Sequence, residues 1–236
     1  MGIGVTGAAD QLGVSTRRVR ALIAAGALRA ERVGGTYVLD EREVDSFADR
    51  DRPGHTRAMS PRIAWAAAAL IDGDTPTWIR QDELSRLRAR LTRAPSTPGA
   101  WHAQMRAVAE SRRTWRAGSE QVAALMADPA TRRTGASATN LVTDLLVGTA
   151  SASVWVPDRT HLERLRRDLG LIPAESGNVT IAVPAVPDLP SWGTDGENVY
   201  RLIVATDLLA DTDPRATAAG RALLEAISSE LARPVR

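Results

Sequence analysis

In the first 25 residues, apolar side chains recur among polar ones at the spacing of two short helices joined by a turn. Thr6 is a candidate cap for the first helix, and Gly13 ends it because glycine tolerates positive φ. Ser15 caps the second helix, and Gly26 closes it. The apolar positions that predict these helices are Ala8, Ala9, Leu12, Val19, Leu22 and Ile23.

A β-hairpin and a third helix are predicted next. Leu28–Val33 and Thr36–Leu39 have the character of short strands, and the Gly34-Gly35 dipeptide between them suits a type I′ turn. Asp40 followed three residues later by Glu43 resembles a capping box, so a helix is expected from Asp40, with Val44 and Phe47 facing the core.

Residues 49–58 are polar and contain Pro-Gly, which is typical of a linker. Beyond it, helices are expected over Ser60–Ile71, around Leu84–Leu91, over Ala100–Arg116, and over residues 119–127 and 136–147. The Ala100–Arg116 helix would place Trp101, Met105, Val108 and Trp115 on one face.

The pattern changes after residue 150. Ala152–Val156, Asn178–Val183 and Asn198–Ala205 are rich in β-branched and apolar residues and are predicted as strands. Asp158 begins a helix to Leu169, and Asp213-Pro214 begins a last helix through about Leu231.

The expected fold class is therefore α+β and mostly helical. An N-terminal winged helix-turn-helix, a helical middle and a small C-terminal α/β domain follow one another. The predicted divisions are residues 1–50, a linker at 51–58, a helical connecting region at 59–133 and an α/β domain at 134–236.

The net charge of this 236-residue chain is only +2, but the charged residues are distributed unevenly between its two halves. Residues 61–133 carry twelve arginines and seven acids, whereas residues 134–236 carry nine arginines and thirteen acids. Contact with nucleic acid is therefore expected in the first half.

The chain has no cysteine, which excludes disulfides and thiolate chemistry. With no signal-peptide or membrane-span pattern, a soluble cytoplasmic protein is expected.

The second predicted helix has the features of a DNA recognition helix. Its arginines lie opposite its apolar positions, and the N-terminal residues of such a helix reach base edges in the major groove. Ser15 and the free amides at the helix start suit a phosphate, and the hairpin tip would meet the DNA backbone or minor groove. The predicted DNA-binding residues are Ser15, Thr16, Arg17, Arg18, Arg20, Arg32, Gly34, Gly35, Thr36 and Tyr37.

Residues 5–48 resemble the excisionase/MerR-type winged helix-turn-helix family. The resemblance rests on the run from Leu12 to Ile23, on Gly26-Ala27-Leu28, and on the run from Arg32 to Tyr37. It implies the winged fold and binding of double-stranded DNA, without specifying the operator.

Residues 60–231 resemble the antitoxins of abortive-infection AbiE systems. The shared features are Gly135-Ala136-Ser137-Ala138, the strand and helix from Val154 to Leu169, Gly177-Asn178-Val179, and Ala205–Leu209 followed by Asp213-Pro214. The His-Gly-Leu usual in that family is absent, with Thr143-Asp144-Leu145 near its place. The resemblance implies a protein that represses its own operon and opposes a nucleotidyltransferase toxin encoded beside it.

Other chemistry is weakly indicated. Gly2–Gly7 matches G-x-G-x-x-G but leaves no room for the preceding strand that nucleotide binding needs. The three histidines are far apart in sequence, so no metal site and no cofactor is expected, and no catalytic acid, base or nucleophile set emerges. Arg106, Arg112, Arg113 and Arg116 form a cluster that is either a solvated helix face or an extra contact for phosphate or an acidic partner.

The sequence thus predicts a non-enzymatic, bacterial, DNA-binding transcription regulator that acts as antitoxin and autorepressor of a toxin–antitoxin operon. An excisionase-like architectural factor and a plain regulator with an interaction domain are the alternatives. Two protomers on repeated half-sites are expected, because one small module buries limited surface on DNA.

Overall fold

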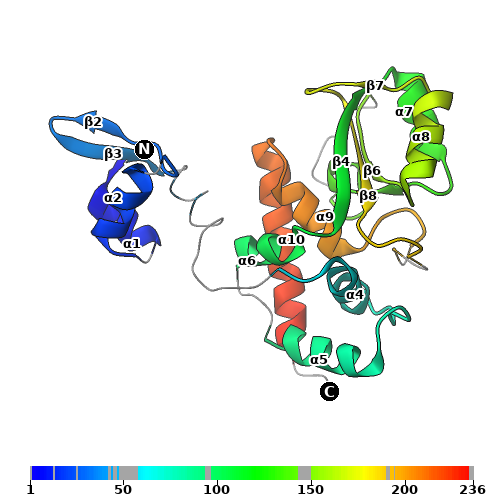
Figure 1. The fold of residues 1–236 in the computed structure, drawn as a ribbon, viewed down its shortest axis with the longest axis horizontal. Coiled ribbons are helices and arrows are strands. Elements are labelled where there is room, and N and C mark those ends of the chain that lie inside the picture. Colours follow the sequence, from blue (N-terminus) through cyan, green and yellow to red (C-terminus); the bar gives the residue numbers. More distant parts are fainter. Residues whose placement is uncertain are drawn as a thin grey trace. The chain divides into compact units, whose positions relative to one another are not determined.

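The chain forms two compact units, Met1–Thr56 and Arg57–Arg236 (Figure 1). A single second unit corrects the expected separation of residues 59–133 from 134–236, because a strand from the first of these segments pairs with a strand from the second. The predicted linker, 51–58, lies almost wholly outside the described residues. The computed structural model describes residues 2–12, 14–24, 26–41, 44, 47, 58–93, 97–142, 150–189, 192–193 and 195–233.

The first unit places helices beside a small antiparallel sheet. The strand order is β1-β3-β2, so the hairpin of β2 and β3 is extended by the N-terminal strand. A buried cluster that includes Val19, Leu28 and Leu39 holds these elements together. The elements are β1 (Gly2–Gly4), α1 (Val5–Leu12), α2 (Thr16–Ala24), β2 (Glu31–Val33) and β3 (Thr36–Asp40).

One expectation for the first unit is wrong, and another is met. The glycine-rich N-terminus is itself strand β1, where Ile3 pairs with Leu39, and helix α1 begins at Val5, one residue before the expected cap. Asp40 is the last residue of β3, opposite Gly2, and the described residues that follow it, Glu41, Val44 and Phe47, are helical, so the helix expected after Asp40 is present. Glu43 lies outside the described residues, while Val44 is buried in the core as expected.

The second unit contains a five-stranded sheet of order β5-β6-β8-β4-β7, in which only the β6–β8 pairing is parallel. Its mixed helices and strands agree with the expected α+β class. Its elements are α4 (Pro61–Ile71), α5 (Gln81–Leu91), α6 (Pro98–Met105), β4 (Ala109–Arg116), α7 (Ser119–Ala127), β5 (Arg132–Arg133), the 3₁₀ turn Gly135–Ser137, β6 (Ala152–Trp155), α8 (Arg159–Asp168), β7 (Ile172–Pro173), β8 (Val179–Pro184), α9 (Arg201–Leu209) and α10 (Pro214–Ala232).

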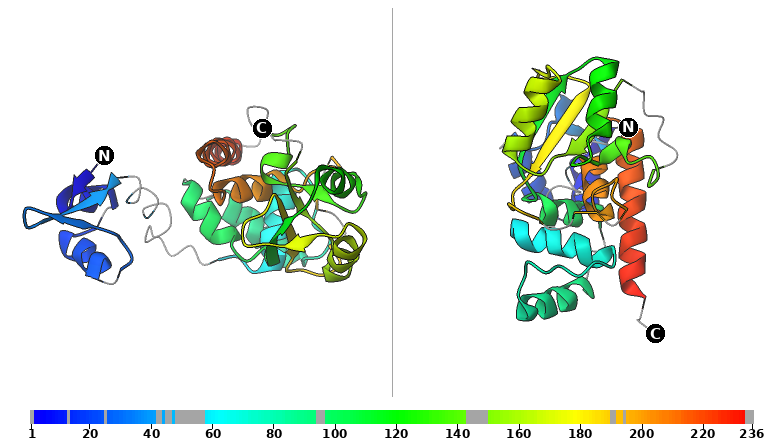
Figure 2. Two further views of the ribbon diagram at one scale, coloured as in Figure 1. Left: turned by 90° about the horizontal axis from the view of Figure 1, so that it is seen from above. Right: turned by 90° about the vertical axis from the view of Figure 1, so that its right-hand side faces the viewer.

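Helices cover this sheet from two sides (Figure 1). Helices α7 and α8 pack on one face, over a cluster that includes Val154, Val179 and Ile181. The other face meets α4, α9 and α10 through a larger cluster that includes Trp155 and Ala182. In the right-hand view of Figure 2, the long helix α10 runs from top to bottom, whereas the shorter helix α4 lies crosswise to it. None of the helices in the described residues is long and apolar enough to cross a membrane.

Three predicted elements of the second unit are wrong. The expected helix over Ala100–Arg116 is helix α6 followed by strand β4, whose residues pair with β8. The expected strand over Asn198–Ala205 is mostly helix α9; it is buried on all sides, and short apolar runs have no periodicity that separates helix from strand. Of the expected helix 136–147, the described part holds a 3₁₀ turn that ends at Ser137, and residues 143–147 lie outside.

One arginine ties the ends of three helices together. Arg201, the first residue of α9, donates from Nε to Asp72 at 2.8 Å and from NH2 to Glu230 of α10 at 2.9 Å. Burial raises the pKa of Asp72 above its ordinary value, whereas the hydrogen bond from Arg201 lowers the pKa of Glu230. Tyr200 adds a bond to Asp74 at 2.8 Å, so the end of α4 is fixed to the start of α9.

Helices α9 and α10 cross closely at Gly220. A Cβ added to Gly220 would lie 2.7 Å from the Leu209 amide nitrogen and 2.8 Å from the Ala205 carbonyl oxygen. We expect Gly220→Ala to lower the free energy of unfolding by about 1–3 kcal/mol through overpacking, despite the better helix propensity of alanine.

Urea denaturation followed by tryptophan fluorescence measures this change, since all six tryptophans lie in the second unit. Ala222→Ser, on the exposed side of the same helix, is the control and should stay within about 0.5 kcal/mol. Equal stability of Gly220→Ala and the control would contradict the close crossing.

Candidate functional site

The outward face of α2 is the first candidate site. Nine helical residues at 100° each place Arg17, Arg20, Ala21 and Ala24 on one side, and all four are exposed. Val19 and Leu22 occupy the opposite side and are buried. The helix therefore presents two arginines and two methyl groups to solvent as one face, and its orientation is fixed by its core residues.

Local capping explains why α2 starts and stops where it does. The Ser15 hydroxyl accepts a hydrogen bond from the Arg18 amide at 3.2 Å, which is the N-cap arrangement that the sequence predicts. At the other end Gly26 has φ of 70°, and the Ala27 amide donates to the Leu22 carbonyl at 2.9 Å. Together with the bond from the Gly26 amide to the Ile23 carbonyl at 3.0 Å, this bond forms a Schellman motif, in which glycine avoids the strain of positive φ.

The hairpin carries the other predicted residues. Gly34 and Gly35 have φ of 57° and 84°, as a type I′ turn requires at both positions, so the predicted turn is confirmed. Arg32 pairs across the hairpin with Tyr37, and its guanidinium carbon lies 6.0 Å from the centre of the Tyr37 ring. This cation–π contact orients Arg32 on the hairpin surface.

The predicted residues thus fall on two elements of one unit. Between residues 15 and 37 the chain carries five arginines and one acid, Glu31. Within the described residues, Arg17, Arg18 and Arg20 are exposed and form no ion pair. Arg18 projects from the flank of α2, between the exposed face and Leu22, and Thr16 is half-buried, so these two stand apart from the Arg17–Arg20 face. Thr36 is exposed beside the turn.

The predicted arginine cluster of the second unit does not form a helix face. Arg112, Arg113 and Arg116 lie on strand β4, where side chains alternate between the two faces of the sheet, and Arg106 follows helix α6. The guanidinium of Arg112 lies 5.5 Å from the ring centre of Trp155 and bonds to Asp207 at 2.5 Å. Arg112 is therefore held by Trp155 and Asp207, and the four arginines do not form one surface.

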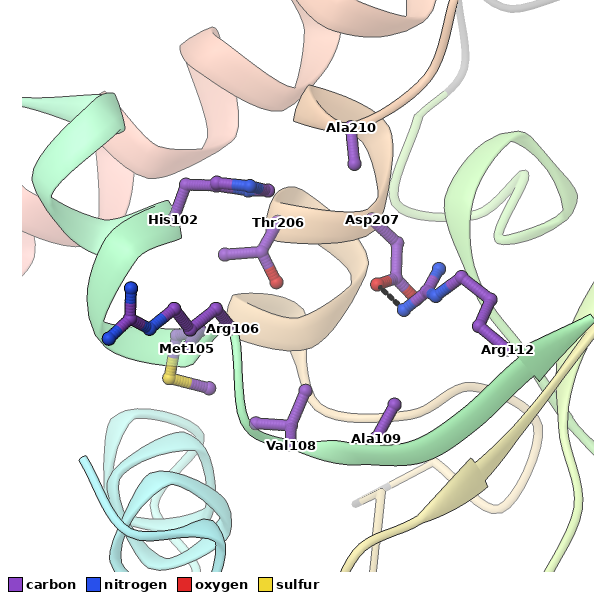
Figure 3. Close-up of a pocket in the computed structure, with 9 residues that line it drawn as sticks. All are labelled: His102, Met105, Arg106, Val108, Ala109, Arg112, Thr206, Asp207 and Ala210. Carbon is purple, nitrogen blue, oxygen red and sulfur yellow. Dashed lines mark hydrogen bonds and ion pairs between the residues drawn. The ribbon is translucent and has the colours of Figure 1, made fainter. Parts of the chain in front are cut away.

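Asp207 on α9 is a buried acceptor that sequence reasoning missed. Besides Arg112, its carboxylate accepts from the Thr134 hydroxyl at 2.6 Å and from the Trp155 indole nitrogen at 2.9 Å. Figure 3 shows Arg112 and Asp207 pointing toward one another in a pocket of about 160 Å³ that His102, Arg106 and Thr206 also line. An acid within the apolar run 202–209 was the available signal, because a buried carboxylate needs partners.

Comparison of the chain with protein-family models, curated proteins and solved structures gives no match.

The Asp207 cluster generates a prediction. We expect Asp207→Ala to lower the free energy of unfolding by about 2–4 kcal/mol, because Thr134 and Trp155 are buried and lose their acceptor. Arg112 is 37% exposed, so water can take over its part of the interaction. The measurement is urea denaturation monitored by tryptophan emission.

The control is Asp168→Ala on α8, which removes a carboxylate that is 49% exposed and 3.6 Å from Arg164. Its effect should be at most about 1 kcal/mol. If both variants lose the same stability, Asp207 does not have the structural role assigned to it.

Proposed function

We propose that the chain is a sequence-specific regulator whose first unit binds double-stranded DNA as a winged helix-turn-helix. The observation that carries this proposal is the Arg17–Arg20 face of α2, which is exposed and makes no ion pair with the described residues, beside a hairpin that holds Arg32 at its surface. A helix of this size fits the major groove, and arginine binds guanine edges or phosphates with two parallel hydrogen bonds.

Each element has a distinct part in this proposal. Helix α2 enters the major groove, where Arg17 and Arg20 contact base edges and the methyl groups of Ala21 and Ala24 permit close approach. The capped start of α2 lies against a phosphate. The hairpin acts as the wing, and Arg32 contacts the backbone or minor groove. Since this surface is small, tight binding uses two protomers on repeated half-sites.

Substitution of the arginines tests the proposal. A duplex selected by the full-length protein from a random pool is the probe, and fluorescence anisotropy gives the dissociation constant. Arg17→Ala and Arg20→Ala should each cost about 1–3 kcal/mol of binding free energy. Arg32→Ala should weaken binding to all sequences and reduce the slope of affinity against salt by about 1.

Arg88→Ala is the matched control, because Arg88 is exposed on α5 in the second unit and its loss changes the net charge equally. It should leave the affinity unchanged. If all three variants in the first unit bind like the control, the recognition surface lies elsewhere.

We also propose, from the resemblance to AbiE antitoxins, that the second unit opposes a nucleotidyltransferase-like toxin encoded next to this gene. The two units have separate buried cores, which supports a division of labour between them. This activity is non-enzymatic in the proposal and needs no cofactor.

Truncation separates the two proposed activities. A chain that lacks residues 1–58 should lose DNA binding in a gel shift but still restore growth when the neighbouring toxin is induced. Residues 1–58 alone should bind DNA weakly and give no rescue. Rescue by the N-terminal fragment would refute the division of labour, and a non-toxic neighbour would leave a plain transcription regulator.

A further inference from the structure

Part of one sheet face in the second unit is lined by hydroxyl groups. On that face, Thr114 of β4 pairs with Thr180 of β8, and Ser153 of β6 pairs with the same threonine. Three hydroxyl-bearing side chains therefore lie in a row across adjacent strands, about 5 Å apart. The next row along, Arg112, Ala182 and Trp155, leads to the helical layer.

The hydroxyl row forms the floor of a pocket of about 690 Å³. Its walls come from three segments far apart in sequence: the turn at Gly135–Ser137, residues 175–178, and the segment from Asp207 in α9 to Thr212 after that helix. The Ser137 oxygen accepts a hydrogen bond from the Ser153 amide at 2.9 Å, and its own hydroxyl proton can still be donated. This volume lies in the range of small-molecule sites.

The charges around the pocket disfavour an anionic ligand. Arg112 is its one lining cation among the described residues, and Asp207 already neutralises it. Glu175 and Asp211 add exposed carboxylates at the same pocket. A phosphate or carboxylate would meet net negative charge there, whereas an uncharged polar molecule would not.

We propose that this pocket binds an uncharged ligand that presents vicinal hydroxyl groups, either as a free sugar or as the ribose of a nucleoside. A hydroxyl both donates and accepts, so a row of them matches a ligand whose neighbouring groups do the same. The carboxylates supply further acceptors for hydroxyl protons. The pocket lies within the second unit, so the proposal is independent of DNA binding by the first.

Isothermal titration calorimetry of the full-length protein with D-ribose, D-glucose and adenosine tests this inference. At least one of the three should bind saturably. If the ribose of a nucleoside is recognised, adenosine binds, 2′,3′-dideoxyadenosine binds at least about tenfold more weakly, and AMP binds more weakly than adenosine. If a free sugar is recognised, ribose or glucose binds at least as tightly as adenosine. Absence of saturable binding by all three probes overturns the proposal.

Variants locate the binding to the hydroxyl row. Thr180→Val and Thr114→Val remove one hydroxyl each at nearly constant shape, and each should weaken the bound probe about three- to tenfold. Thr160→Val, at an exposed position on α8, should bind like the unaltered protein. Circular dichroism checks folding, and Ser153→Ala replaces a threonine variant that does not fold. Unchanged affinity in the folded floor variants would place the ligand outside this pocket.

Discussion

The buried carboxylate of Asp207 is the group on which the second unit depends. It belongs to α9, yet its partners are Thr134 before the 3₁₀ turn, Trp155 of β6 and Arg112 of β4. One carboxylate thus joins the helical layer to the sheet through directional hydrogen bonds, which apolar contacts do not provide. A buried acid without partners would be strongly destabilising, so the three donors and the acid must be present together.

The same interaction shapes the pockets of this unit. Because Arg112 is held against Trp155 and Asp207, it lines both the small pocket beside α6 and the larger pocket whose floor carries hydroxyl groups.

In the first unit, apolar burial determines the orientation of the recognition helix. A nine-residue helix is too short to persist in water alone, so α2 depends on Val19 and Leu22 in its small core. Their burial determines which arginines face outward.

Short-range signals in the sequence predict much of this architecture. Pro61, Asp158 and Asp213 mark the starts of α4, α8 and α10, and the side chains of the two aspartates accept the expected capping bonds. The hairpin follows from Gly34-Gly35 in the same way, because a positive φ at both positions is a local requirement.

The errors arise where a distant partner decides the local structure. Strand β4 carries polar residues at helical as well as strand positions, and its pairing with β8, some seventy residues later in the chain, selects the strand. Residues 202–208 of helix α9 are all buried, so the sequence of this helix has no amphipathic period. The hydroxyl row has no sequence signal of its own, since strand register alone brings Thr114, Thr180 and Ser153 together.

Binding of duplex DNA by the face of α2 and the hairpin can be measured directly from backbone amide chemical shifts of the full-length protein, recorded by NMR during titration with a selected DNA duplex. The largest shifts are expected in residues 15–24 and 31–37, with the amides of residues 58–233 nearly unchanged. Shifts confined to the second unit, or no saturable shifts at salt concentrations near 0.1 M, would contradict it.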